Sequence, residues 1–273
     1  MSLIRTIVRR LPPGWVRAAG QLQFRYPILA PLIRRAGAGF SRGESVMRHG
    51  VGKGLRFDPA GGNPGYALGT SDIEEQEALA RLLKPGDVFY DIGANVGFFA
   101  IIAARLVGPS GHVHAFEPFA GSAGAIRDNA ARNGFVNVNV HECAVSDKEG
   151  QGELLVERGG TEFKLVDGAA PAPGKKISVR IVQIDALLAA GTLPPPRVVM
   201  IDAEGAEVNV LKGMWQTLAQ HRPIVLCEVH WLGAAFTEIC DRASQELGYQ
   251  TRPLAGGEIP QGPIRWHAIM EPR

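Results

Sequence analysis

Cysteines and long apolar runs are both scarce in this sequence. Only three of its 273 residues are cysteine, namely Cys143, Cys227 and Cys240, and they show no CxxC spacing. This scarcity argues against a disulfide framework and a zinc site, and it indicates free thiols in a reducing compartment. No apolar run approaches the roughly 18 to 20 residues that cross a bilayer. The N-terminal stretch also lacks the features of a secretory signal, so we expect a cytoplasmic location.

Positive charge is concentrated at the N-terminus. Residues 1–60 hold 11 Lys and Arg against 2 Asp and Glu, whereas the remaining 213 residues hold 18 against 25. The net charge of +2 therefore combines a local balance of +9 with one of −7. Two interpretations stay open: a solvated basic extension, or a segment that makes peripheral contact with an anionic membrane or a lipid-linked substrate. We expect no nucleic-acid partner, because the rest of the chain is acidic.

Strand-like and helix-like segments alternate from residue 87 onward. The segments "VFYDI" (88–92) and "HVHAFEP" (112–118) are typical of strands, and "VGFFAIIAARLV" (96–107) between them is typical of a buried helix. This alternation predicts an α/β fold with a doubly wound, mostly parallel sheet. We divide the chain into a basic N-terminal extension and substrate-lid region, residues 1–68, and a main domain, residues 69–273.

Two local patterns make sharper predictions. Ser71 stands three residues before Glu74, ahead of "EEQEALARLL", which predicts a capping box that opens a helix. The segment "VNVNVHECAV" (136–145) alternates with period two, which predicts a single strand.

A glycine-containing turn follows the first predicted strand of the sheet, where doubly wound folds bind their ligands. Gly93 allows a tight turn close to a ligand, and Gly97 lets the next helix start close to the strand. Asn95 stands between them and tolerates a left-handed backbone. The GxGxxG spacing of a dinucleotide fingerprint is missing, which weighs against a nicotinamide cofactor.

Two acidic residues narrow the choice of ligand. Asp91 ends the strand before the turn, where a carboxylate repels phosphate and suits a cationic group. Glu117 ends the next strand, 20 residues after Gly97, at the position where a carboxylate binds ribose hydroxyls. A cationic amino acid joined to a nucleoside satisfies both conditions, and S-adenosylmethionine is such a ligand.

Four stretches of the sequence resemble the FkbM family of S-adenosylmethionine-dependent methyltransferases. In chain order they are "YDIGANVGFFAIIAA", "HVHAFEPFA", "IDAEGAEVNVLKG" and "PIVLCEVH", and the resemblance runs from about Gly69 to Glu228. It implies a Rossmann-like class I methyltransferase fold, with a seven-stranded sheet whose last strand is antiparallel. It also implies O-methylation of a hydroxyl on a sugar, glycolipid or polyketide-like product. Met200 is a departure, since the family usually has a lysine before the ID motif.

The resemblance also assigns roles by position. It places Asp91, Gly93, Asn95 and Gly97 at the methionine part of the cofactor, Glu117 at the ribose, Cys143, Ala144 and Val145 at the adenine, and Asp202 and Glu204 beside the transferred methyl. If the family's lysine assists catalysis, its replacement by Met200 leaves the base in question. If it only pairs with a neighbouring acid, the methionine repacks.

Proton removal from a hydroxyl calls for an imidazole or a carboxylate of raised pKa. Candidate bases at strand ends are Asp202, Glu204, Glu228 and His230, with Glu207 one turn into the helix after the fourth strand. We prefer His230 oriented by a carboxylate, or Glu228 itself. A divalent cation on Asp202, Glu204 and Glu228 is left open but not predicted. Two other functions also stay open: a non-catalytic binding protein on this fold, and a nicotinamide-dependent oxidoreductase.

Overall fold

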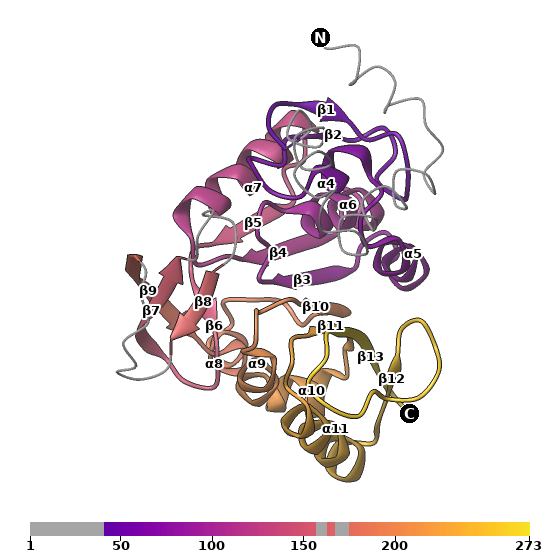
Figure 1. The fold of residues 1–273 in the computed structure, drawn as a ribbon, viewed down its shortest axis with the longest axis vertical. Coiled ribbons are helices and arrows are strands. Elements are labelled where there is room, and N and C mark those ends of the chain that lie inside the picture. The colour runs from indigo at the N-terminus through magenta and orange to yellow at the C-terminus, as the bar shows by residue number, and fades with distance from the viewer. Residues whose placement is uncertain (1–40, 157–162, 167–174) are drawn as a thin grey trace, which may run out of the picture.

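A central sheet of seven strands organises the molecule (Figure 1). The computed structural model describes residues 41–156, 163–166 and 175–273, so most of the predicted basic extension lies outside the described residues. The strands, in chain order, are β3 (Val88–Ile92), β4 (His112–Phe116), β5 (Val138–His141), β10 (Val198–Ile201), β11 (Ile224–Val229), β12 (Tyr249–Pro253) and β13 (Trp266–Pro272).

The order of these strands across the sheet is β12-β13-β11-β10-β3-β4-β5. Strands β10, β3, β4 and β5 pair in parallel, as do β10 and β11, whereas β13 runs antiparallel to both β11 and β12. The predicted α/β sheet with an antiparallel last strand is therefore confirmed. Strand order reverses between β3 and β10, and ligands of doubly wound sheets bind at the carboxyl ends of the strands at such a point.

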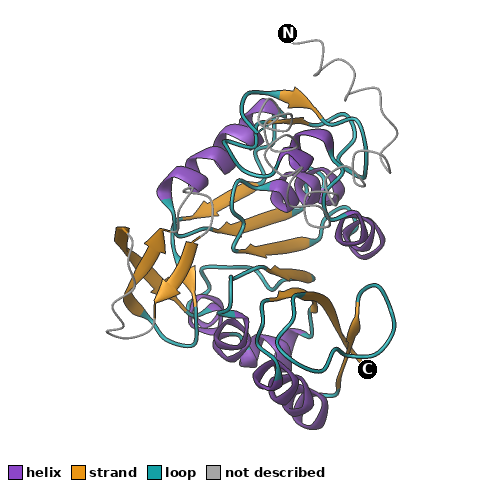
Figure 2. Cartoon of the chain, in the orientation of Figure 1, coloured by secondary structure: helices purple, strands orange, loops and turns teal. Residues whose placement is uncertain are grey.

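Helices cover both faces of the sheet (Figure 2). Their bounds are α4 (Pro64–Leu68), α5 (Ile73–Leu82), α6 (Phe98–Val107), α7 (Ala120–Arg132), α8 (Ile184–Ala189), α9 (Glu207–Gly213), α10 (Trp215–His221) and α11 (Ala234–Leu247). One apolar cluster joins α5 and α6 to the sheet through Phe89 and Met200. A second joins α9, α10 and α11 to the opposite face through Tyr90 and Ile201. Burial on both faces explains the nearly continuous apolar sequences of these strands.

A smaller four-stranded sheet lies beside the main one. Its strands are β6 (Ala144–Val145), β7 (Gly150–Val156), β8 (Phe163–Val166) and β9 (Lys175–Val182), in the order β6-β9-β7-β8. The prediction of one strand over 136–145 is wrong, because β5 ends at His141 and Ala144–Val145 leaves the main sheet to pair with β9.

The part of the predicted extension that the structure describes packs on the main domain. A two-stranded ladder of β1 (Ser45–Val46) and β2 (Arg56–Phe57) precedes α4. Phe57, which is fully buried, packs in one cluster with Phe98 and Ile101 of α6. Within the described residues, none of the helices has the length and apolar character needed to span a membrane.

The predicted capping box is wrong. Helix α5 begins at Ile73, and its N-cap is Asp72, which has a left-handed backbone (φ 50°) and makes no side-chain capping bond. Ser71 therefore lies one residue outside the cap, where its carbonyl accepts a hydrogen bond from the Gln76 side chain at 2.6 Å.

Candidate active site

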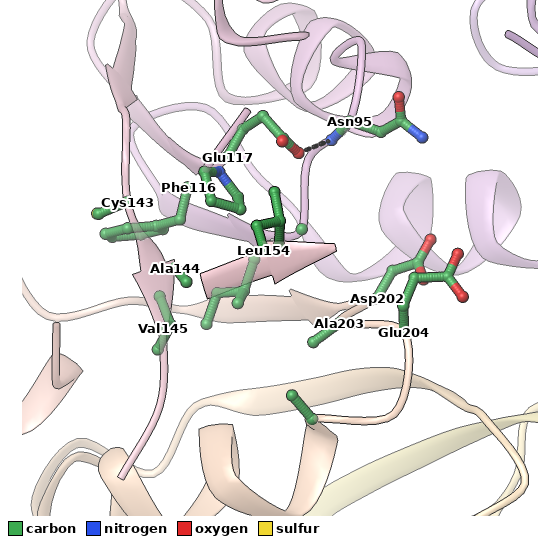
Figure 3. Close-up of a pocket in the computed structure, with 14 residues that line it drawn as sticks. Asn95, Phe116, Glu117, Cys143, Ala144, Val145, Leu154, Asp202, Ala203 and Glu204 are labelled. Carbon is green, nitrogen blue, oxygen red and sulfur yellow. Dashed lines mark hydrogen bonds between the residues drawn. The ribbon is translucent and has the colours of Figure 1, made fainter. Parts of the chain in front are cut away.

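A cavity opens at the carboxyl ends of the central strands, where the strand order reverses (Figure 3). It encloses about 640 Å³, a figure that includes space open to solvent. Of the twelve residues predicted for the site, eight line this cavity: Gly93, Asn95, Glu117, Cys143, Ala144, Val145, Asp202 and Glu204. Cys143 to Val145 form one end, and the carboxylates of Asp202 and Glu204 lie together at the other. Asp91, Gly97, Glu228 and His230 are not in its lining.

The glycine turn between β3 and α6 is held by close backbone packing. Gly93 has φ 82°, and a Cβ placed there would lie 1.8 Å from the carbonyl oxygen of Asp202. Only glycine therefore lets the turn pass the end of β10. Asn95 has φ 50°, which confirms the expected left-handed backbone. Gly97 also has positive φ, but the group its Cβ would meet is Ile126 of α7, at 3.1 Å, rather than the strand that we expected.

Glu117 connects the end of β4 to this turn. Its carboxylate accepts hydrogen bonds from the backbone N–H of Asn95 at 2.9 Å and of Phe119 at 2.8 Å. The residue is only 4% exposed. Burial raises the pKa of Glu117 to about 7, although the two backbone N–H groups oppose that shift. Each carboxylate oxygen keeps further lone pairs for a ligand in the cavity.

Asp91 is buried beneath α6. Side chains alternate along a strand, which puts Asp91 on the face that Phe89 shares with α5 and α6. Its Oδ2 atom is buried without a hydrogen-bond partner. Burial raises the pKa of Asp91 to about 7, against the effect of a hydrogen bond from the Ala100 backbone. Contact between Asp91 and a ligand in the cavity stays a prediction.

Met200 lies directly beside Asp91. The two residues are Cα partners in the parallel pairing of β10 with β3, so their side chains share a face of the sheet. Met200 is 2% exposed and packs in the apolar cluster under α5 and α6. A side chain at position 200 therefore lies beside Asp91 rather than in the lining of the cavity.

Four carboxylates surround the imidazole of His230, beyond the end of the cavity that Asp202 lines. Its Nδ1 atom lies 2.8 Å from Oε1 of Glu207. Its Nε2 atom lies 3.5 Å from Glu204 Oε2, 3.6 Å from Glu228 Oε1 and 3.7 Å from Asp202 Oδ1. We call these five residues the acidic cluster. It includes the four candidate bases predicted from the sequence.

Burial and mutual repulsion set the electrostatics of the acidic cluster. Burial, together with the charges of Glu228 and Glu204, raises the pKa of Asp202 well above its usual value. Burial alone would lower the pKa of His230, but the hydrogen bond and charge of Glu207 outweigh it and raise the pKa. The cluster therefore favours a bound cation or proton.

Sequence reasoning named Glu207 beside the candidate bases but did not name Arg265. Glu207 is fully buried, and its Oε1 atom also accepts the backbone N–H of Gly205 at 3.0 Å, so it is fixed where it can orient His230. It is the first residue of α9 rather than one turn into the helix, as the sequence had suggested. Arg265 donates its Nε–H to Oε1 of Glu228. No local pattern marks Arg265, because it lies in the loop before β13 and meets Glu228 only through the fold.

Comparisons with known proteins identify relatives of this chain. Residues 91–251 match the family model described as the methyltransferase FkbM domain. The 31-O-demethyl-FK506 methyltransferase FkbM of Streptomyces tacrolimicus is 31% identical over 189 residues, which cover 58% of this chain and 70% of the relative. The hexuronic acid methyltransferase AglP of Haloferax volcanii is 28% identical over 168 residues, covering 58% of this chain and 64% of the relative.

Solved structures include a similar chain at low sequence identity. The crystal structure of methyltransferase FkbM from Methylobacillus flagellatus KT has a TM-score of 0.47 and 14% identity, covering 76% of this chain and 52% of that one. The present chain thus spans about two thirds of the curated relatives and about half of this solved structure.

Proposed function

This chain belongs to the FkbM methyltransferase family, and from that premise we propose that it moves a methyl group from S-adenosylmethionine to a hydroxyl oxygen. The proposed acceptor is a sugar, a glycolipid or a polyketide-like small molecule. The names of the two curated relatives support this choice. One acts on 31-O-demethyl-FK506, which names an oxygen position, and the other acts on hexuronic acid, a sugar acid.

The observation that carries the proposal is the convergence of seven of the nine predicted cofactor residues on one cavity. Gly93, Glu117 and Asp202 come from the ends of three different strands and line the same space. The residues present also fit a cationic nucleoside. Glu117 keeps acceptor capacity for ribose hydroxyls, and the carboxylate of Asp202 lines the same cavity.

The residues of the chain would perform two tasks in the reaction: they would position the two substrates, and they would remove the proton from the acceptor hydroxyl. When bound, S-adenosylmethionine supplies a methyl on a sulfonium, whose C–S bond breaks as the new C–O bond forms. Glu117 and the backbone of the glycine turn would hold the ribose and methionine parts. The acidic cluster would hold the acceptor hydroxyl and receive its proton. Positioning is worth roughly 7 to 11 kcal/mol, and help from a base adds about 10²- to 10⁴-fold.

The two alternative functions find less support. A pyrophosphate in the cavity would meet the charge of Glu117 as this residue ionises, which weighs against a nicotinamide cofactor. A non-catalytic protein was suggested by the loss of the family's lysine. Met200 occupies that position inside the apolar cluster beside Asp91, so the replacement leaves the lining of the cavity unchanged.

A transfer assay tests the proposal. The full chain is incubated with methyl-labelled S-adenosylmethionine and a panel of sugar acids, glycolipids and hydroxylated macrocycles, and labelled products are located by mass spectrometry. We expect label on an oxygen of one acceptor class. Glu117→Gln should lower this transfer, whereas the exposed control Asp241→Asn should not. Label on nitrogen or carbon, or transfer that is indifferent to Glu117→Gln, would refute the proposal.

A further inference from the structure

His230 presents a buried nitrogen atom that has no hydrogen-bond partner. The residue is 4% exposed, and Glu207 holds its Nδ1 side. Its Nε2 atom is buried and unpaired, and it points toward three carboxylates at 3.5 to 3.7 Å. Oδ1 of Asp202 is a second buried atom without a partner in the same place. A buried polar atom without a partner is costly, so two of them facing each other indicate a missing ligand.

The charge of the surroundings indicates which kind of ligand is missing. Four carboxylates surround one imidazole, and the arginine that pairs with them is Arg265, on Glu228. The Arg265 side chain is 54% exposed, so it lies at the rim of the cluster, whereas that of Glu228 is 8% exposed. Buried carboxylates are normally paired with cations or coordinate metals. The acidic cluster therefore has room for more positive charge than the chain itself supplies.

We propose that Asp202, Glu228 and His230 bind one divalent cation, with Glu207 as the residue that orients the histidine ligand. One donor atom from each of the three lies within 4.8 Å of the others. Metal–ligand bonds of about 2.0 to 2.2 Å put ligand atoms roughly 3 to 4 Å apart, so small side-chain movements complete the site. The arrangement Glu207–His230–cation is the carboxylate–histidine–metal pattern that fixes the imidazole in metal sites.

The donor set favours a first-row transition metal. Two carboxylate oxygens suit Mg²⁺, Ca²⁺ and Mn²⁺, whereas an imidazole nitrogen suits Zn²⁺, Fe²⁺ and their neighbours. Mn²⁺ accepts both carboxylate and imidazole ligands and is directly detectable by electron paramagnetic resonance. We therefore choose it as the probe. Three protein ligands leave coordination positions for water or for a substrate oxygen.

The consequence for catalysis rests on the proposed function. Asp202 lines the cofactor cavity and also belongs to the cation site, so a bound cation would lie next to the position of the transferred methyl. An acceptor hydroxyl bound to the cation becomes more acidic. Glu204 would accept its proton, and the hydroxyl oxygen would form the new bond to the methyl carbon as the methyl–sulfur bond breaks and S-adenosylhomocysteine leaves. His230 then acts as a ligand rather than as the base that the sequence suggested.

A titration with Mn²⁺ tests the site without any need for the acceptor. The full chain is stripped with a chelator and titrated with MnCl₂, and free Mn²⁺ is measured by electron paramagnetic resonance. We expect one bound ion per chain. His230→Gln and Asp202→Asn should each weaken binding at least about 10-fold, and Glu207→Gln by about 10- to 100-fold. Arg265→Gln should tighten binding, because it removes the competing cation from Glu228.

Matched controls separate loss of a ligand from loss of the fold. His112→Gln changes an exposed histidine at the start of β4, at the end of the strand away from the site. This variant should bind Mn²⁺ like the wild type. Circular dichroism of each apo variant confirms that it folds. Mn²⁺ binding that is absent, or that survives both His230→Gln and Asp202→Asn in folded protein, overturns the cation site. S-adenosylhomocysteine binding in the same samples reports on the proposed function separately.

Discussion

The substitution Asp91→Asn should stabilise the ligand-free protein at neutral and alkaline pH. Asp91 is 2% exposed, and burial raises the pKa of its carboxyl from 3.8 to about 7. Ionising this group in the native state is therefore costly. Asparagine has almost the same shape and keeps an oxygen that accepts the Ala100 N–H, but it never ionises. The variant thus removes the cost without emptying the site.

The size of the effect follows from the two pKa values. Between pH 3.8 and about 7 the native carboxyl binds a proton more tightly than the unfolded one, so the free energy of unfolding falls as pH rises through this window. The full difference corresponds to about 4 kcal/mol. Between about pH 5 and about pH 8, the contribution of Asp91 is a loss of roughly 2 to 3 kcal/mol. Glu117, whose pKa is also raised to about 7, adds a comparable loss.

Urea unfolding of the apo protein at about pH 5 and about pH 8 measures this effect. The wild type should lose several kcal/mol of stability between the two, and Asp91→Asn should lose roughly 2 to 3 kcal/mol less. The exposed control Asp241→Asn should behave like the wild type. Equal pH dependence in wild type and Asp91→Asn would refute the idea that Asp91 is a strained, buried acid.

Three further substitutions test neighbouring parts of the account. Met200→Lys places an ammonium beside Asp91 on the same sheet face, so it should lower the pKa of that acid and flatten the pH dependence of urea unfolding; an unchanged profile would contradict the predicted pairing. Glu117→Gln should weaken S-adenosylmethionine binding about 10- to 100-fold by calorimetry, since bonds to a charged acceptor are worth about 1.5 to 3 kcal/mol. Wild-type affinity should rise with pH through about 7 as this carboxylate ionises, and a flat affinity profile would argue against its contact with ribose. Gly93→Ala should cost more than about 3 kcal/mol of stability or prevent folding, because its Cβ would lie 1.8 Å from the Asp202 carbonyl oxygen; the control Gly124→Ala, inside α7 with open space around it, should instead be neutral or stabilise by up to about 1 kcal/mol.

Sequence patterns predict the main sheet of this protein well because its central strands are short, largely apolar and followed by a turn. Val88–Ile92 and Ile224–Val229 could be read in this way, since burial on both faces leaves each strand with a single acidic residue, Asp91 or Glu228. The smaller sheet is harder to predict. Ala144–Val145 continues the alternation of β5 but pairs with β9, and no local signal shows where a strand changes sheets. The same limit explains Ser71, whose capping pattern is overruled by the left-handed backbone of Asp72.

The candidate site shows a similar division. Residues at strand ends could be placed together from the sequence, because parallel strands bring their carboxyl ends to one edge. Contacts across the sheet could not. The proximity of Met200 to Asp91 depends on the register of β10 against β3, and the pairing of Arg265 with Glu228 depends on where a loop before β13 lies. The alternation of side chains along β3 likewise places Asp91 under α6 rather than in the lining of the cavity.

Cofactor binding by isothermal titration calorimetry tests the central claim most directly. The full chain is titrated with S-adenosylmethionine, with S-adenosylhomocysteine and with NADH under one set of conditions. We expect that the first two bind at one site per chain, that Glu117→Gln weakens both, and that NADH gives no binding heat. Tight binding of NADH, or no binding of either adenosyl ligand by folded protein, would contradict it.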